Sequence, residues 1–197
     1  MRLTIIRHGT TAWNRDARYQ GWRDVPLDET GEREAVALRD RLAGERFDAV
    51  ISSDLGRCLT TARLALPDAS IETDPGLREL RFGDWEGRTY TECLAAAPDA
   101  FPRWMRDPAA TTPPGGESLL EFETRIYQTV DAIAARHATA PDARIAVVTH
   151  GGVLRALARR ASGVDAAAGY AIAIPNCAVA RLVYAADGST TFTLDDA

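Results

Sequence analysis

The stretch Leu3-Thr4-Ile5-Ile6-Arg7-His8-Gly9, close to the first residue of the chain, is the part of the sequence that best reveals the fold. Residues 3–6 are apolar or β-branched, a pattern typical of a short buried strand that ends at Arg7. A histidine then stands where the chain leaves the sheet. The arrangement returns at Ile145-Ala146-Val147-Val148-Thr149, an apolar run that leads into His150-Gly151-Gly152. Two predicted strands therefore end at a histidine followed by glycine.

Strand-like and helix-like segments alternate around these two runs. Further strands are predicted over residues 48–51, 70–73, 178–184 and 190–194, the last two flanking Asp187-Gly188, a sequence typical of a turn. Apolar residues at helical spacing predict helices over residues 30–43, 55–66, 117–137 and 151–161, and Ser53 or Asp54 is suited to cap the second. This alternation predicts an α/β fold, a three-layer α/β/α sandwich with a mainly parallel central sheet.

The chain length suits a single domain. Its 197 residues, taken as one domain over 1–197, are enough to bury roughly 70% of the surface that the unfolded chain exposes. Residues 77–116 are less regular, with a helical stretch near 89–97 and the turn-forming Pro113-Pro114-Gly115-Gly116. We expect this segment to be an insertion that covers the active site at one edge of the domain.

Composition excludes several classes of function. The formal net charge of −5 argues against a general nucleic-acid binder. All 23 basic residues are arginines, so Schiff-base chemistry and a Walker P-loop, which need lysine, are excluded. The three cysteines and three histidines form no zinc-binding pattern, and reduced thiols predict a cytoplasmic protein. No signal peptide or membrane-spanning run is found, so no membrane partner is expected.

Three predicted strands end in reactive polar residues, namely Arg7-His8, Ser52-Ser53-Asp54 and His150-Gly151. Parallel sheets place ligand sites beyond the carboxyl ends of their strands, so these residues are expected to converge. Neutral imidazole can attack phosphorus, which makes His8 a candidate nucleophile. His150 could donate hydrogen bonds to a transferring phosphoryl group, and the helix that begins near Gly151 adds backbone N–H groups suited to an anion.

Two arginines and one glutamate complete the candidate chemistry. Arg7 and Arg57 carry planar charged forks that match phosphate oxygens. Glu79 is the best candidate for the general acid that protonates the leaving oxygen, because a bound phosphate nearby favours a neutral carboxyl group. Asp84 and Glu86 are rival carboxylates for this role.

Taken together, these segments resemble the histidine phosphatase superfamily, in its phosphoglycerate mutase-like branch. The matching segments cover the chain from residue 2 to about residue 160, in the order that the family has. They are Arg7-His8-Gly9-Thr10-Thr11 with Trp13-Asn14, Tyr19-Gln20-Gly21-Trp22, Pro26-Leu27, Ser52-Ser53-Asp54-Leu55 through Arg57 to Thr61-Ala62, Leu77-Arg78-Glu79, Phe82-Gly83-Asp84-Trp85-Glu86-Gly87, Pro114-Gly115-Gly116-Glu117-Ser118 and Thr149-His150-Gly151-Gly152. Thr10 stands where the family often has glutamate, a small departure.

The resemblance implies a role for each matching site residue. His8 would be the phosphorylated nucleophile and Glu79 the proton donor. Arg7, Arg57 and His150 would form the phosphate pocket. The substrate side of the pocket would be lined by Asn14, Gln20, Gly21 and the backbone of Gly151. The resemblance implies no metal and no cofactor.

Within this family the chain is closer to the compact phosphatases, such as α-ribazole phosphatase, than to the longer mutases. The expected function is metal-independent hydrolysis of a small-molecule phosphate monoester through a phosphohistidine. A phosphoglycerate mutase-type phosphotransferase and a non-catalytic phospholigand-binding protein are the alternatives. Histidines that ligate a metal are a third hypothesis, disfavoured because the expected neighbours of His8 are arginines. The identity of the ester and the choice between monomer and homodimer stay open.

Overall fold

Six strands form a single sheet within the residues that the computed structural model describes, which are 1–137, 140, 142–185 and 189–195. The strand order is β3-β2-β4-β1-β5-β6. The bounds are β1 Arg2–Arg7, β2 Ala49–Ser52, β3 Ile71–Thr73, β4 Arg144–Thr149, β5 Val179–Tyr184 and β6 Thr190–Leu194. Strands β1 to β4 pair in parallel, whereas β5 is antiparallel to both β1 and β6. The mainly parallel sheet predicted from the sequence is confirmed, and the last two strands supply its antiparallel edge.

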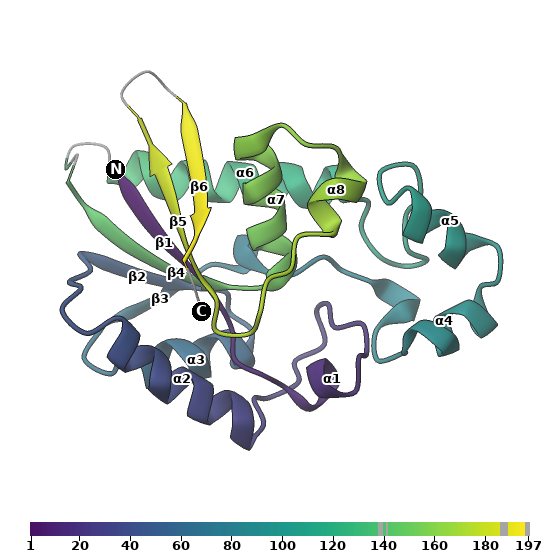
Figure 1. The fold of residues 1–197 in the computed structure, drawn as a ribbon, viewed down its shortest axis with the longest axis horizontal. Coiled ribbons are helices and arrows are strands. Elements are labelled where there is room, and N and C mark those ends of the chain that lie inside the picture. Colours follow the sequence, from purple (N-terminus) through teal and green to yellow (C-terminus); the bar gives the residue numbers. More distant parts are fainter. Residues whose placement is uncertain (138–139, 141, 186–188, 196–197) are drawn as a thin grey trace.

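Side chains of the central strands alternate between two apolar cores. Ile5 and Val147 belong to a core with α6 (Leu119–Arg136) and α7 (Gly151–Ser162) on one face of the sheet. Ile6 and Val148 belong to a second core with α2 (Glu29–Arg41) and α3 (Gly56–Ala65) on the other face. Figure 1 shows these two helix pairs on opposite sides of the strands. Burial on both faces explains why β1 and β4 are continuous apolar runs, and it confirms the three-layer sandwich.

The register of the central strands aligns the residues that follow them. Arg7 of β1 pairs with Thr149 of β4, and the backbone N–H of His8 donates to the Thr149 carbonyl oxygen over 2.9 Å. The backbone N–H of Ser53, just after β2, donates to the Val148 carbonyl oxygen over 2.9 Å. Three polar strand ends thus lie side by side at one edge of the sheet.

The predicted helices form within two residues of their expected bounds, and capping contacts from near and distant residues mark where they begin. The Asp28 carboxylate accepts from the N–H groups of Thr30 and Gly31, so α2 begins at Glu29. The expected cap of α3 by Ser53 or Asp54 is wrong. The N-cap residue is Leu55, and the carboxylate of Asp24, on a distant loop, accepts from the Gly56 N–H over 2.8 Å. A residue outside the local sequence therefore supplies this cap.

The irregular region contains one expected helix, and the chain also has short helices that the sequence patterns did not reveal. The helix expected near residues 89–97 is α4 (Tyr90–Ala96), followed by α5 (Ala100–Arg106), both to the right in Figure 1. The remaining short elements are α1 (Ala12–Arg15), α8 (Ala166–Tyr170) and the 3₁₀ turns η1 (Pro75–Leu77) and η2 (Gly83–Trp85). Ring contacts hold this region together, for example those of Trp104 with Phe82, Trp85 and Tyr170. Apart from α4, these helices of four to seven residues were not predicted, because so few residues carry little apolar periodicity.

Two further expectations concern the turn before the last strand and the lack of membrane-spanning segments. The turn at Asp187-Gly188 lies outside the described residues. Among the helices of the described part of the chain, none has the length and apolar character that crossing a membrane requires.

Candidate active site

His8 is buried at the carboxyl end of β1, with its ring held in one tautomer. Its Nδ1 lies 2.7 Å from the carbonyl oxygen of Gly9. Since a carbonyl can only accept, Nδ1 carries the proton and Nε2 carries the lone pair. Burial, together with the positive charges of Arg57 and Arg7, holds the pKa of His8 well below its ordinary value. The ring is therefore neutral at pH 7 and has a nucleophilic Nε2.

His150 lies edge-on to His8, with the two ring centroids 5.3 Å apart. It is fully buried, and its Nε2 is 2.9 Å from the hydroxyl oxygen of Ser53. Burial, followed by the charge of Arg57, lowers the pKa of His150 well below its ordinary value. The structure thus brings the three strand ends together, with Ser53 orienting the second histidine. Donation from His150 to a phosphoryl group stays a prediction.

Arg7 and Arg57 approach His8 with their guanidinium groups partly anchored. The Arg7 Nη1 donates to the carbonyl oxygen of Ile174, and burial next to Arg155 lowers the pKa of Arg7 to about 10. Arg57 is fully buried and donates to the carbonyl oxygens of Gly21 (2.7 Å) and Arg23 (2.9 Å). These anchors fix each arginine while leaving its Nε uncommitted.

Three buried side-chain nitrogens have no hydrogen-bond partner among the described residues. They are Nε of Arg7, Nε of Arg57 and Nε2 of Gln20. An unpartnered buried donor is costly, and such groups are usually satisfied by a ligand or water. All three residues were predicted from the sequence to bind phosphate or substrate, and all three atoms are donors. A phosphate ester offers only acceptors on its phosphoryl oxygens, so it complements this set.

The Glu79 carboxylate, which lines the same cleft as His8, is held by backbone donors. It accepts from the N–H groups of Leu80 (2.8 Å) and Gly152 (2.9 Å). A Cβ at residue 152 would lie 2.0 Å from the nearer carboxylate oxygen, so only glycine permits this approach. The rival Glu86 instead accepts from backbone N–H groups of Trp22 and Arg23.

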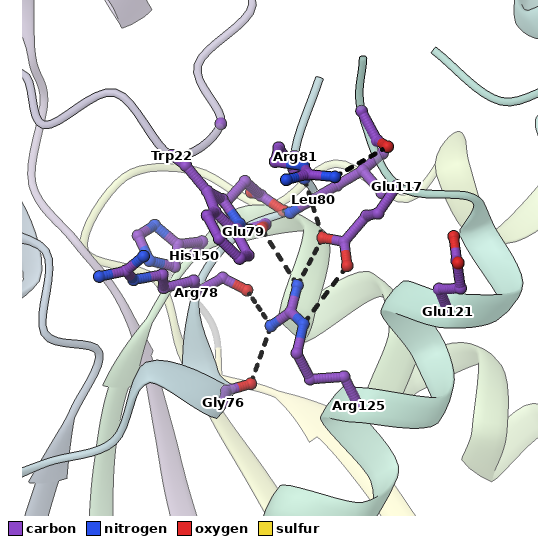
Figure 2. A network of polar contacts seen from close by, with 12 residues as sticks. Trp22, Gly76, Arg78, Glu79, Leu80, Arg81, Glu117, Glu121, Arg125 and His150 are labelled. Atoms are coloured by element: carbon purple, nitrogen blue, oxygen red, sulfur yellow. Dashed lines mark hydrogen bonds and ion pairs between the residues drawn. The ribbon is translucent and has the colours of Figure 1, made fainter. Parts of the chain in front are cut away.

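The backbone around Glu79 is clamped by Arg125 from helix α6. Figure 2 shows its guanidinium group donating to the carbonyl oxygens of Gly76 (2.9 Å), Arg78 (2.9 Å) and Glu79 (3.3 Å). The same group forms an ion pair with Glu117 at 2.5 Å. These contacts fix the loop that presents the Glu79 carboxylate.

Trp22 adds a second restraint to this loop. Its indole Nε1 donates to the Glu79 carbonyl oxygen over 2.8 Å, and its ring lies under the guanidinium carbon of Arg78 at 4.9 Å. Trp22 stands between Gly21 and Arg23, the two residues whose carbonyl oxygens hold Arg57. The segment Gly21-Trp22-Arg23 therefore contacts both the backbone of Glu79 and the guanidinium group of Arg57, and it couples their positions.

These groups border a cleft of about 260 Å³. Predicted residues that line it are Arg7, His8, Asn14, Gln20, Glu79 and Gly151. Arg57 and His150 are fully buried and are not among the residues that line the cleft. Gly21 does not line it in the described part of the chain, because its carbonyl oxygen faces Arg57. Gly21 thus supports Arg57, and its contact with a substrate stays a prediction.

Several lining residues were missed by the sequence analysis. They are Arg18, Tyr19, Phe82, Met105, Arg155 and Tyr170. Asn176 was missed too, and its amide donates to the His8 carbonyl oxygen over 3.0 Å. Arg155 had a local signal, since it lies one helical turn after Gly151 and shares that face of the helix. The others come from loops and short helices whose positions no local pattern reveals.

The fold and this cleft together define a class of protein. The chain belongs to the histidine phosphatase superfamily (branch 1), whose sequence profile matches residues 3–196. The glucosyl-3-phosphoglycerate phosphatase of Mycolicibacterium vanbaalenii is 39% identical over 163 residues, which cover 79% of this chain and 72% of the relative.

Two further comparisons agree with this assignment. The adenosylcobalamin/α-ribazole phosphatase of Escherichia coli strain K12 is 35% identical over 171 residues, covering 85% of this chain and 82% of the relative. The crystal structure of the α-ribazole phosphatase from Shigella flexneri superposes with a TM-score of 0.89 at 29% identity, covering 100% of this chain and 96% of the other. The chain is thus similar to phosphatases that act on small molecules.

Proposed function

We propose that this protein is a phosphatase that hydrolyses a small-molecule phosphate monoester through a phosphohistidine at His8. The observation that carries the proposal is the neutral, buried His8 beside three unpartnered donors, from Arg7, Arg57 and Gln20. His8, Arg7 and Gln20 line one cleft, and Arg57 lies close enough to His8 for its charge to lower the pKa of that ring. The names of the relatives support the same reaction class.

In the first step, Nε2 of His8 attacks the phosphorus atom while the bond to the ester oxygen breaks. Arg7 and Arg57 neutralise the charge on the equatorial oxygens, which is the main requirement of phosphoryl transfer. Glu79, in its protonated form, gives its proton to the leaving oxygen, so an alcohol departs. His150 is assigned to hydrogen-bond the transferring group, and Asn14, Gln20 and Gly151 to the substrate side of the pocket.

In the second step, water attacks the phosphohistidine. The Glu79 carboxylate, now ionised, accepts a proton from this water, and the nitrogen–phosphorus bond breaks to release inorganic phosphate. Neutral His8 and protonated Glu79 are thereby restored. His8 and Glu79 each act in both steps, and the reaction requires no metal or cofactor.

The segment 77–116 acts, in this proposal, as an insertion that covers the active site of a single domain. Phe82, Trp104 and Met105 from this segment line the cleft, which supports the covering role. The partner is a small phosphate ester rather than nucleic acid or membrane, and the protein works as a monomer or homodimer. Free thiols at Cys58, Cys93 and Cys177 support a cytoplasmic location, where thiols stay reduced.

The test is phosphate release from a panel of monoesters with EDTA present, including 3-phosphoglycerate, α-ribazole 5′-phosphate and an aryl phosphate. The expected result is release that EDTA does not suppress and that a His8→Ala variant lacks. Isomerisation of 3-phosphoglycerate without release would replace the proposal by a mutase. Tight phosphate binding with neither reaction would indicate a non-catalytic binding protein.

A further inference from the structure

Gly9, which follows the proposed nucleophile, is flanked by two peptide groups that side chains of two different helices hold. Its N–H donates to the hydroxyl oxygen of Thr61 in α3 over 3.0 Å. The next N–H, that of Thr10, donates to the carboxylate of Glu34 in α2 over 2.8 Å. The other carboxylate oxygen of Glu34 accepts from the Thr10 hydroxyl over 3.0 Å. Both oxygens of Glu34 therefore bind one residue of the loop that carries His8.

Helix α2 lies directly against this loop, because two glycines remove the side chains that would separate them. A Cβ on Gly9 would lie 2.5 Å from the Gly31 carbonyl oxygen, and a Cβ on Gly31 would lie 2.0 Å from the Thr10 carbonyl oxygen. Glu34 stands one helical turn after Gly31, so the two residues share a face of α2. The close packing thus brings the Glu34 carboxylate to the Thr10 backbone.

The contact with Glu34 bears on His8 through the peptide group between Gly9 and Thr10. This group is planar and trans, so its C=O and its N–H point in opposite directions. Glu34 holds the N–H, and the Gly9 carbonyl oxygen at the opposite side lies 2.7 Å from Nδ1 of His8. Glycine itself restrains its backbone dihedrals little, so the orientation of this peptide has to be fixed by its contacts.

The orientation of this peptide decides which ring nitrogen of His8 carries the proton. The carbonyl oxygen of Gly9 can only accept, so it keeps the proton on Nδ1. A flipped peptide would present the Thr10 N–H to Nδ1 instead, and Nδ1 would then have to accept. The proton would move to Nε2, which would lose the lone pair that attacks phosphorus.

We propose that Glu34 is a positioning residue that keeps Nε2 of His8 unprotonated by holding the peptide between Gly9 and Thr10. This inference rests on the proposed phosphatase function, since the tautomer matters to the reaction only if His8 attacks phosphorus. Burial supports it, because His8 is 3% exposed and water cannot readily replace the Gly9 carbonyl oxygen as the partner of Nδ1. A carboxylate is also a strong acceptor for a backbone N–H.

The direct test is ¹⁵N NMR of the free protein with labelled histidine, because protonated and unprotonated ring nitrogens have well-separated shifts. The chain has three histidines, and the signals of His8 are those that His8→Ala removes. We expect the wild-type protein to hold the proton on Nδ1. In Glu34→Met, which has a similar size but no acceptor, a population with the proton on Nε2 should appear. Glu34→Gln should keep the wild-type signals, because its amide oxygen can accept from the Thr10 N–H while its NH₂ donates to the Thr10 hydroxyl.

Turnover should follow the tautomer while phosphate binding does not. We expect Glu34→Met to lower kcat/KM for an aryl phosphate by about 10- to 100-fold, the range of one hydrogen bond to a charged group. Inhibition by inorganic phosphate should change by less than about threefold, because the donors of Arg7, Arg57 and Gln20 remain in place. Glu34→Gln should stay within about threefold of the wild type in both measurements.

A matched control is Glu32→Met on the same helix, whose exposed side chain points away from the loop. It should change neither the ¹⁵N signals of His8 nor kcat/KM. Glu34→Asp is the second test variant, because it keeps the charge but withdraws the acceptor by one methylene group. It should show the same change of tautomer as Glu34→Met, and it decides the matter if Glu34→Met does not fold.

Two results would overturn the inference. One is a His8 tautomer that stays wild-type in Glu34→Met and Glu34→Asp. The other is an equal loss in Glu34→Gln and Glu34→Met, which would assign the effect to the charge of Glu34 rather than to its hydrogen bond. Failure of the wild-type protein to release phosphate from any ester would refute the proposed function instead, and the NMR comparison would still show what Glu34 holds.

Discussion

The two buried histidines should make the stability of this protein depend on pH in a defined direction. His8 and His150 are 3% and 0% exposed, and burial beside arginines lowers the pKa of each well below 6.5. Between pH 6.5 and these lowered values, the unfolded chain binds protons that the folded protein does not. The free energy of unfolding must therefore fall as the pH falls through this window.

The magnitude follows from the linkage relation. Each histidine that gains a proton only on unfolding contributes a slope of up to about 1.4 kcal/mol per pH unit. For an unfolded-state pKa near 6.5, lowering the pH from 7.0 to 5.5 costs about 1.2 kcal/mol per histidine, or about 2.5 kcal/mol for both. This is a large fraction of the stability of a typical domain.

The assay is urea unfolding at pH 7.0 and 5.5, in a buffer without phosphate because phosphate would bind the site. His8→Asn and His150→Asn should each remove about half of the pH dependence, whatever their effect on absolute stability. His137→Asn, which alters the histidine at the end of α6 instead, should preserve the wild-type difference. A wild-type protein equally stable at both pH values would refute the reasoning, as would variants that keep the full difference.

Three further predictions concern turnover and the loop that carries Glu79. His8→Ala should abolish phosphate release and leave the circular dichroism spectrum unchanged, while His137→Ala stays active; a pure and active His8→Ala preparation would end the proposed mechanism. Glu79→Gln should slow alkyl phosphates by at least about 100-fold and aryl phosphates much less, because good leaving groups need no proton; equal slowing of both would remove Glu79 from the general-acid role. Arg125→Met should lower the free energy of unfolding by about 3 kcal/mol, because Glu117 loses its partner, and should lower kcat about tenfold for alkyl phosphates. Arg136→Met is its control on the same helix, because the pair that Arg136 forms with Glu72 is exposed; equal effects of both variants would contradict the clamp.

The sequence sufficed to locate much of the site because the relevant signals are local. The apolar runs before His8 and His150 predicted buried parallel strands, and such strands end at one edge of a sheet. Their observed register, with Arg7 opposite Thr149, places the two histidines side by side as that rule requires. Glu79 and Arg57 could be named from the family resemblance, although neither stands at the end of a strand.

Other features depend on burial and on contacts between distant segments, which no local pattern encodes. Gly21 reads like a substrate contact in the sequence, yet its carbonyl oxygen holds Arg57. Asp24 caps a helix that Ser53 or Asp54 was expected to cap. The short helices α1, α5 and α8 are held by their tertiary surroundings and have too little periodicity of their own.

The sequence by itself therefore determined the layered α/β architecture, the strand ends and the identity of the groups that meet there. Only the tertiary structure decided their physical state. Enclosure by neighbouring elements makes His8 neutral and leaves the donors of Arg7 and Gln20 without partners. Arg125 clamps the backbone of Glu79 from 46 residues away. Desolvation and charge balance are properties of the folded surroundings, and they exist only once segments far apart in the chain have come together.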